Sequence, residues 1–374
     1  MKHRFHHPFL AVAAALIAPA GAENFCGCPS GASLLTPGTA TCEIIDGSTI
    51  INLTGNTVIG WDHFAVPEGR AMQFNFANPA HTVVNRVTGT SPTLIAGELQ
   101  SNGHVVILSP NSWLLIRPSA RITAGSFTAS GLDADPARFF DGSSEIEFHA
   151  TAQSHPTTVI RGRIATTRGD VVLVGRELQV VGEINAAGSV TAVTGEQVTF
   201  QRHAPTATQT EGGGQIIQGG VVQAGGDIAF ITQQALSMTG EMRAGDGHGR
   251  FFAKVSDGGN MLIGNAGLVI HAGTAEFSTE PVGEVAFIPP AEGDNPGSAT
   301  PALNEFPSLA ANRTATRTTP TSSTITARAG TGFSKTEESE TRQRPRALAE
   351  NVPQVRKRSF FRTRATVTPS SPGR

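Results

Sequence analysis

The stretch that decides the fold is residues 162–184, GRIATTRGDVVLVGRELQVVGEI, which begins and ends on a Gly-X-Ile motif. Gly162-Arg163-Ile164 returns 20 residues later as Gly182-Glu183-Ile184. Further along, Gly220-Val221-Val222 is followed after the same step by Gly240-Glu241-Met242. A constant period of this length is typical of a solenoid, in which coils stack and pair edge to edge because one coil cannot bury its apolar face alone. The repeat therefore predicts a parallel β-helix with about 20 residues in each coil.

The composition agrees with many short strands joined by turns. Glycine is abundant at 42 residues, charged residues make up only 16%, and tyrosine is absent. Short β-rich runs such as 105–108, 113–116 and 170–174 show no sustained helical period. With strands ~4.8 Å apart, the repeat region at 45–288 would hold about 12 coils over roughly 60 Å, and insertions would lower these figures. Residues 201–215, with Pro205 and three consecutive glycines, are expected to form one such loop.

The two ends of the chain differ from its middle. Residues 289–374 are rich in Thr, Ser, Pro and Arg, and from 301 onward they hold thirteen Lys and Arg against five Glu, a net charge of +8. We expect this tail to be disordered. Its basic cluster at 356–358 could bind a polyanion or could simply be solvated. At the other end, residues 23–44 are the natural cap for the open first coil, whose uncovered edge would otherwise pair with another chain.

The first 22 residues have the features of a secretory signal peptide. Lys2 and Arg4 precede a short apolar run at 9–17, and Ala20-Gly21-Ala22 offers a small-residue cleavage site. The apolar run is too short to span a bilayer. The alternative is a buried strand or helix. No later stretch is long and apolar enough to be a transmembrane segment, so the sequence predicts a released or surface-held protein.

Three cysteines, Cys26, Cys28 and Cys42, follow the predicted cleavage site. In an oxidising compartment a disulfide could form, and the best pairing joins Cys42 to one of the other two. The number and spacing of these cysteines do not suit a zinc site.

Two runs in the first half carry a family resemblance. The segments 85–92 (NRVTGTSP) and 95–103 (IAGELQSNG), continued by 76–79 upstream and 105–110 downstream, resemble the N-terminal secretion domain of filamentous haemagglutinins, the exported partners of two-partner secretion systems. The resemblance is strong from about 50 to 150 and looser to about 288. The residues that carry its motifs are Asn85, Arg86, Val87, Thr88, Gly89, Asn102, Gly103, Ser109, Pro110, Asn111 and Ser112.

This resemblance implies a right-handed parallel β-helix that is exported through the outer membrane. An outer-membrane β-barrel transporter would recognise the secretion domain while it is unfolded, and coil-by-coil folding outside would favour outward movement. The protein would then be secreted or held at the cell surface, with an adhesin- or haemagglutinin-like role and a host-cell or surface polysaccharide as ligand. Neither composition nor charge indicates a nucleic-acid partner. The chain could also be a short remnant of a longer adhesin.

One position departs from the family pattern. The family usually has Asn-Pro-Asn-Gly before an aliphatic residue, whereas this chain has Ser109-Pro110-Asn111-Ser112-Trp113. Proline and asparagine suit the turn, but Ser112 stands where glycine would permit a positive φ. We therefore expect this turn to differ from the family geometry, with an effect on transporter recognition.

The alternative reading is a β-helical carbohydrate-active enzyme, a polysaccharide lyase or hydrolase. Such enzymes need two or three carboxylates on neighbouring coils of one face. The one dense acidic group, Asp133, Asp135 and Asp141, lies in a loop that the secretion family shares. The histidines are scattered, and phosphate-binding and dinucleotide motifs are absent from the sequence. The sequence therefore predicts a protein that is not an enzyme and that holds no metal or cofactor.

Overall fold

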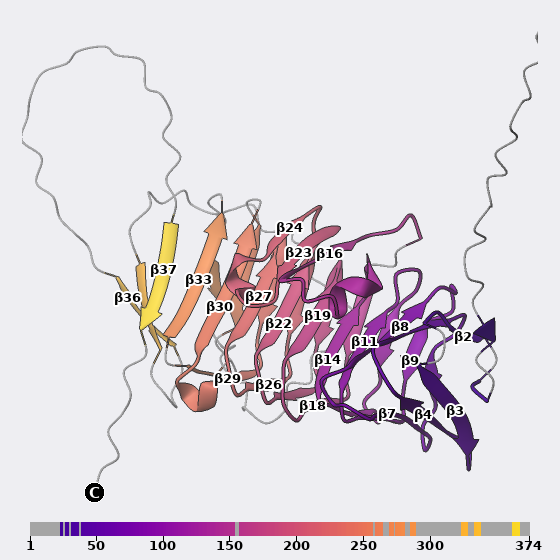
Figure 1. The fold of residues 1–374 in the computed structure, drawn as a ribbon. Coiled ribbons are helices and arrows are strands. Elements are labelled where there is room, and N and C mark those ends of the chain that lie inside the picture. Colours follow the sequence, from indigo (N-terminus) through magenta and orange to yellow (C-terminus); the bar gives the residue numbers. More distant parts are fainter. Residues whose placement is uncertain are drawn as a thin grey trace, which may run out of the picture.

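The computed structural model describes residues 27–280, except 30, 37–38, 154–156, 257–258, 265–268 and 273, together with short strands at 23–24, 285–288, 323–327, 333–337 and 361–366. The fold is the predicted right-handed parallel β-helix. Its strands stack along one axis from the N-terminal to the C-terminal coils (Figure 1). The predicted signal peptide lies outside the described residues, as does Cys26. Within the described ranges, no helix has the length and apolar character needed to cross a membrane.

Three parallel sheets form the faces of the solenoid, and each coil contributes one strand to each. Sheet B holds β4 (Ser48–Leu53), β7 (Ala71–Phe76), β10 (Glu98–Ser101), β13 (Arg121–Ala124), β18 (Arg163–Thr166), β21 (Glu183–Ala186), β26 (Val221–Ala224), β29 (Glu241–Ala244) and β32 (Val269–His271). Sheet A holds β5 (Thr57–Trp61), β8 (Thr82–Val87), β11 (His104–Leu108), β14 (Ser126–Ser130), β19 (Val171–Gly175), β22 (Val190–Thr194), β27 (Ile228–Thr232), β30 (Arg250–Ser256) and β33 (Thr274–Glu280). Sheet C holds β6 (Ala65–Val66), β9 (Thr93–Ile95), β12 (Leu114–Ile116), β17 (Thr157–Ile160), β20 (Glu177–Val180), β25 (Gln215–Gln218), β28 (Ala235–Met238), β31 (Asn260–Gly264) and β34 (Val285–Ile288).

The repeated glycines are explained by the close approach of successive coils at one corner. A Cβ atom on Gly182 would lie 2.1 Å from the carbonyl oxygen of Gly162, and one on Gly220 would lie 2.0 Å from that of Gly182. Gly240 meets Gly220 in the same way, at 2.0 Å. Because a side chain at any of these positions would collide with the backbone beneath it, the 20-residue step in the sequence is this corner repeated.

The described residues form nine coils, fewer than the expected 12, because two excursions leave the solenoid at the corner between sheets A and C. Residues 131–153 leave the coil after β14, and residues 195–214 leave between β22 and β25. The predicted loop at 201–215 falls in the second excursion. The excursion carries β23 (Gln197–Gln201), η2 (Pro205–Ala207) and β24 (Gln209–Glu211), so it is not a plain loop.

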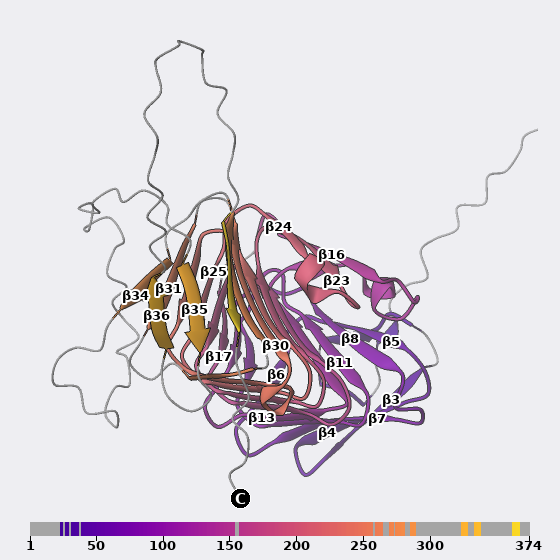
Figure 2. The ribbon, with the colours of Figure 1, turned by 90° about the vertical axis from the view of Figure 1, so that its left-hand side faces the viewer.

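The two excursions pair with each other to form a small antiparallel sheet, sheet D, outside the coil (Figure 2). Its strand order is β15 (Asp133–Ala134), β16 (Glu145–His149), β23 and β24, and η1 (Pro136–Phe139) lies between the first two. A second apolar cluster, separate from the core inside the coil, lies between sheet D and the outer face of sheet A. This cover explains why β19, Val171–Gly175, is buried on both of its faces.

Antiparallel strands close the first coil. β2 (Ala32–Leu34) pairs with β5, and β3 (Ala40–Ile45) pairs with β4. β1 (Glu23–Asn24) pairs with β2. A disulfide joins Cys28 to Cys42 within this N-terminal segment, with their Cα atoms 5.2 Å apart.

Within 289–374, where the sequence predicts disorder, the structure describes three short strands. β35 (Ser323–Ala327) and β36 (Phe333–Glu337) pair with each other, and β37 (Phe361–Thr366) pairs antiparallel with β33. The rest of the tail lies outside the described residues.

Within the solenoid, the η3 turn (Gly245–Gly247) precedes β30.

Candidate functional site: the secretion-motif coils

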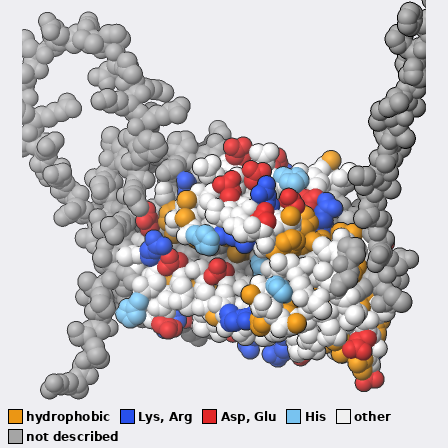
Figure 3. Space-filling view, in the orientation of Figure 1, with side chains coloured by type: hydrophobic (Ala, Val, Ile, Leu, Met, Phe, Trp, Pro, Cys, Tyr) orange, Lys and Arg blue, Asp and Glu red, His pale blue; other side chains and the backbone are white. Residues whose placement is uncertain are grey.

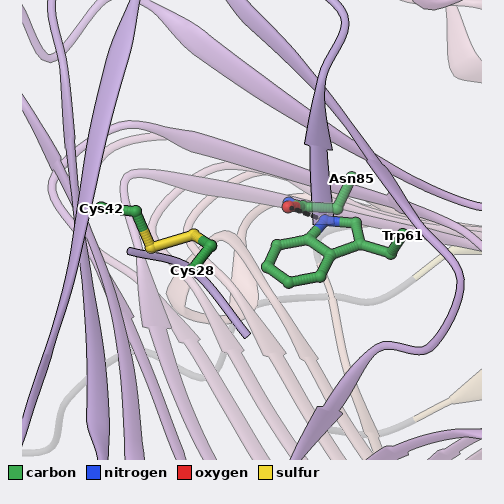
Figure 4. The surroundings of a disulfide bond; sticks show 4 residues. All are labelled: Cys28, Cys42, Trp61 and Asn85. Atoms are coloured by element: carbon green, nitrogen blue, oxygen red, sulfur yellow. Dashed lines mark hydrogen bonds between the residues drawn. A yellow bond between two sulfur atoms is a disulfide. The ribbon is translucent and has the colours of Figure 1, made fainter. Parts of the chain in front are cut away.

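The residues of the secretion motif lie on neighbouring N-terminal coils, and most of their contacts run from one coil to the next. Asn85 is fully buried in β8. Its Oδ1 accepts a hydrogen bond from the indole nitrogen of Trp61 on the preceding coil at 3.0 Å, a contact drawn in Figure 4. Its Nδ2 donates to the carbonyl oxygen of Val106 on the following coil at 3.2 Å. The amide therefore links three successive strands of sheet A.

Arg86 points to the outer side of the same strand. Its Nε and a terminal nitrogen donate to the two carboxylate oxygens of Asp133, at 3.0 and 2.5 Å. Asp133 is nearly buried, and the hydrogen bond to this carboxylate raises the pKa of the guanidinium. The pair fixes β15, the first strand of sheet D, to the coil.

The next three motif residues complete the end of β8. Val87 is buried in the core inside the coil. The backbone nitrogen of Thr88 donates to the carbonyl oxygen of Trp61 at 2.8 Å. A Cβ atom on Gly89 would lie 1.8 Å from the carbonyl oxygen of Asp62, so only glycine fits this approach of two coils.

Asn102 and Gly103 occupy a second contact between coils. Asn102 accepts a hydrogen bond from the backbone nitrogen of Phe76 and donates one to its carbonyl oxygen, both at 2.8 Å. This side chain continues the backbone ladder where β7 ends. A Cβ atom on Gly103 would lie 2.3 Å from the ring of Phe76, which explains the glycine that follows the asparagine.

The turn at 109–112 is held by buried hydroxyl groups. The hydroxyl oxygens of Ser109 and Ser112 are 3.0 Å apart, and that of Ser109 is 2.8 Å from the hydroxyl of Thr93. Pro110 is buried, and Asn111 donates to the carbonyl oxygen of Thr88 at 2.9 Å. Ser112 does not have a positive φ. The turn therefore does not require glycine at position 112, and the serine hydroxyl adds a hydrogen bond there.

The acidic residues of the first excursion do not form one cluster with a shared role. Asp133 pairs with Arg86, Asp135 accepts a hydrogen bond from the backbone nitrogen of Ala137 at the start of η1, and Asp141 accepts one from that of Ser143. Among the residues that the structure describes, no group of three or more His, Cys, Asp and Glu side chains could hold a metal ion. Acidic side chains gather over the outer side of sheet D (Figure 3).

The contact between sheet D and sheet A contains charged and titratable residues that the sequence did not single out, among them His104 and Arg202. His104, on β11, lies 3.0 Å from the hydroxyl of Thr128 and edge-on to the ring of Phe139. Burial, and to a smaller extent the nearby charge of Arg202, lowers the pKa of His104 to about 4. Arg202 lies over the Phe139 ring, and burial lowers its pKa.

The sequence carried little signal for these contacts. Trp61, Asp133, His104 and Arg202 lie at ordinary strand or loop positions. A usable clue was the alternation of polar and apolar residues in Glu145–His149 and Gln197–Gln201, which predicts two amphipathic strands beside the coil.

Comparison with known proteins agrees with this architecture. The family model for the TPS (two-partner secretion) domain matches residues 29–245, which is more than half of the chain. The chain therefore belongs to the family of TPS secretion domains.

Individual relatives are distant. The heme/hemopexin-binding protein of Haemophilus influenzae is 28% identical over 102 residues, which are 27% of this chain and 11% of that protein. The crystal structure of the HMW1 secretion domain from Haemophilus influenzae aligns with a TM-score of 0.50 and 24% identity, over 69% of this chain and 76% of that one. The filamentous haemagglutinin secretion domain aligns with a TM-score of 0.38 and 15% identity, over 68% of this chain and 99% of that one. The chain thus spans about a tenth of the length of the curated relative that it matches.

Proposed function

We propose that an outer-membrane β-barrel transporter of the two-partner type recognises the secretion motif of this chain before the β-helix folds. The observation that carries the proposal is the burial of part of the motif. Asn85, Val87, Ser109 and Ser112 are almost completely inaccessible in the folded coil. The polar side-chain atoms of Asn85 and Ser109 also form hydrogen bonds with residues of neighbouring coils. A receptor that reads these side chains has access to them only while the chain is extended.

Folding outside the cell would then favour export. Each coil that forms buries several aliphatic side chains inside the solenoid, and each of these contributes about 1.5–3 kcal/mol relative to exposure. Each coil also pairs its three strands with the coil before it. Because a folded coil cannot return through a pore that passes an extended chain, addition of coils would make the movement directional.

We further infer that the exported protein is secreted or held at the cell surface and has an adhesin-like binding role, with a host-cell or surface polysaccharide as its ligand. Membership of the secretion-domain family supports this location. A signal peptide at 1–22 would take the chain to the periplasm first.

A catalytic role as a polysaccharide lyase or hydrolase is the less favoured alternative. On sheet B, the first residues of four successive strands pair in a column. Their order is Glu98, Arg121, Arg163 and Glu183, so two arginines separate the two carboxylates. Within this described column, carboxylates on neighbouring coils are therefore not available as an acid–base pair. We propose that the protein is not an enzyme.

The test is secretion by cells that express the cognate transporter. Deletion of residues 85–112 is expected to abolish release of the chain and leave it in the periplasm. The matched control is deletion of residues 221–240, which removes one 20-residue coil in register, since Val221 pairs with Glu241 and Val222 with Met242. This control chain should be released. Unchanged secretion after deletion of 85–112 would overturn the proposal.

A further inference from the structure

A slot remains between sheet D and the outer face of sheet A, and its two walls differ in character. It has a volume of about 250 Å³. Its outer wall is apolar and is formed by Phe139, Phe148 and Phe200. Its inner wall includes the polar side chains of His104, Thr128 and Asp170, which come from three successive coils, together with Val172. An apolar wall that faces a few convergent polar groups is the usual character of a small-molecule site.

Arg202, at the edge of the slot, lacks a partner for one of its donors. A terminal nitrogen donates to the carbonyl oxygen of Arg138 at 2.5 Å, whereas the Nε–H is buried and has no hydrogen-bond partner among the described residues. The guanidinium also has no ion pair in the described part of the chain. A buried donor without an acceptor costs about 1–3 kcal/mol, more when the group is charged. A carboxylate in the slot would remove this cost.

Asp170 supplies the opposite charge. It stands in the same register column as Ser126, directly before β19. Its Oδ1 accepts a hydrogen bond from the backbone nitrogen of Ser189 at 2.7 Å. Its Oδ2 has no hydrogen bond among the described residues. His104 remains neutral at pH 7, because burial and Arg202 disfavour its charged form. The slot is therefore lined by one guanidinium, one carboxylate and three phenyl rings, with the imidazoles of His104 and His203 beside them.

We propose that this slot binds a free α-amino acid with an aromatic side chain. The carboxylate of the ligand would accept hydrogen bonds from the Arg202 guanidinium, and its ammonium group would lie beside Asp170. Its ring would pack among Phe139, Phe148 and Phe200, where aromatic pairs stabilise each other beyond the area that they bury. A simple anion would pair with Arg202 but leave Asp170 opposed by a second negative charge, so a zwitterion fits the slot better.

The experiment is calorimetric titration of the folded, full chain at pH 7 with L-phenylalanine. Two analogues test the two charges separately, phenylalaninamide without the carboxylate and N-acetylphenylalanine without the ammonium group. Saturable binding of L-phenylalanine is expected, with a Kd at least tenfold weaker for each analogue. Arg202→Met and Asp170→Asn should each weaken binding of L-phenylalanine to the same extent.

The matched control is Arg176→Met, because Arg176 pairs with Glu196 on the surface, away from the slot. This variant should bind as the unmodified chain does. Should Arg202→Met fail to fold, Asp170→Asn and the two analogues still decide the question. Absence of saturable binding up to the solubility of L-phenylalanine would overturn the proposal. So would equal affinity for the amino acid and both analogues.

Discussion

At the scale of single residues, the motif asparagines Asn85 and Asn102 join successive coils through their side-chain amides. Asn85 satisfies the indole N–H of Trp61 on one side and the carbonyl of Val106 on the other, with no access to water. Asn102, which is exposed, forms hydrogen bonds with both the backbone nitrogen and the carbonyl oxygen of Phe76. An amide has a donor and an acceptor in one plane, so it can extend a strand ladder where the strands themselves stop.

Substitution of Asn85 by alanine should therefore destabilise the fold. The change leaves the buried Trp61 N–H without an acceptor, and the expected loss in free energy of unfolding is about 2–3 kcal/mol. Urea denaturation of the folded chain measures it. Asn75→Ala is the control, because Asn75 donates to Asn52 in an exposed pair, and its effect should stay within about 0.5 kcal/mol. Equal effects of the two substitutions would contradict the assigned role.

Ser112→Gly tests the turn that departs from the family pattern. Because Ser112 does not have a positive φ and its hydroxyl meets that of Ser109, glycine relieves no strain and removes a hydrogen bond. The expected result is a loss of about 1–2 kcal/mol in stability, from the hydrogen bond and from the greater freedom of the unfolded chain. Denaturation midpoints measure the change. A more stable Ser112→Gly protein would show that the turn does favour glycine.

At the scale of elements, the docking of sheet D on sheet A should depend on pH through His104. The pKa of this histidine falls from 6.5 to about 4 on folding, so the unfolded chain binds its proton more readily. Its neutral form therefore contributes stability above about pH 6.5, and this contribution is lost as the pH falls toward 4. We expect a loss on the order of 2 kcal/mol across this window.

Thermal unfolding followed from pH 7 to pH 4 measures this dependence. His104→Gln should reduce the loss of stability at low pH. His248→Gln changes an exposed histidine and should leave that loss as large as in the unmodified chain. An identical pH profile for all three proteins would show that His104 does not couple to folding.

The same elements show what the sequence could and could not predict. The coil was predictable, because a glycine corner such as Gly182 on Gly162 leaves a fixed period in the sequence. The motif residues were found by resemblance, but their coil-to-coil partners, such as Trp61 and Asp133, depend on long-range register. Sheet D was missed because its strands come from two segments about 50 residues apart, as in the pairing of Ile146 with Phe200. Neither strand alone reveals its partner.

At the scale of the whole molecule, we expect stability to be local, so that different coils can unfold with different free energies. Each coil contacts only its neighbours, so damage at one end stays near that end. The Cys28–Cys42 disulfide closes a short loop in the N-terminal cap, with a sequence separation of 14, and such a loop contributes roughly 3 kcal/mol in the chain-entropy model.

Replacement of both cysteines by serine should consequently increase amide hydrogen exchange in the first coils. Strands β2 to β5 should lose protection, and strands β26 to β31 should keep it. Mass spectrometry of peptides along the chain measures both regions in one experiment. A uniform loss of protection would mean that the solenoid unfolds as one cooperative unit.

The central proposal is that the transporter reads this chain before it folds, because the motif residues Asn85, Val87, Ser109 and Ser112 are buried once the coils have formed. It is tested most directly by binding to the immobilised periplasmic part of the cognate transporter. The folded chain is compared with the same chain unfolded in urea and diluted at the moment of injection. We predict that the freshly diluted chain binds at least tenfold more tightly, and that deletion of residues 85–112 removes this advantage. Equal or tighter binding by the folded chain would contradict the account.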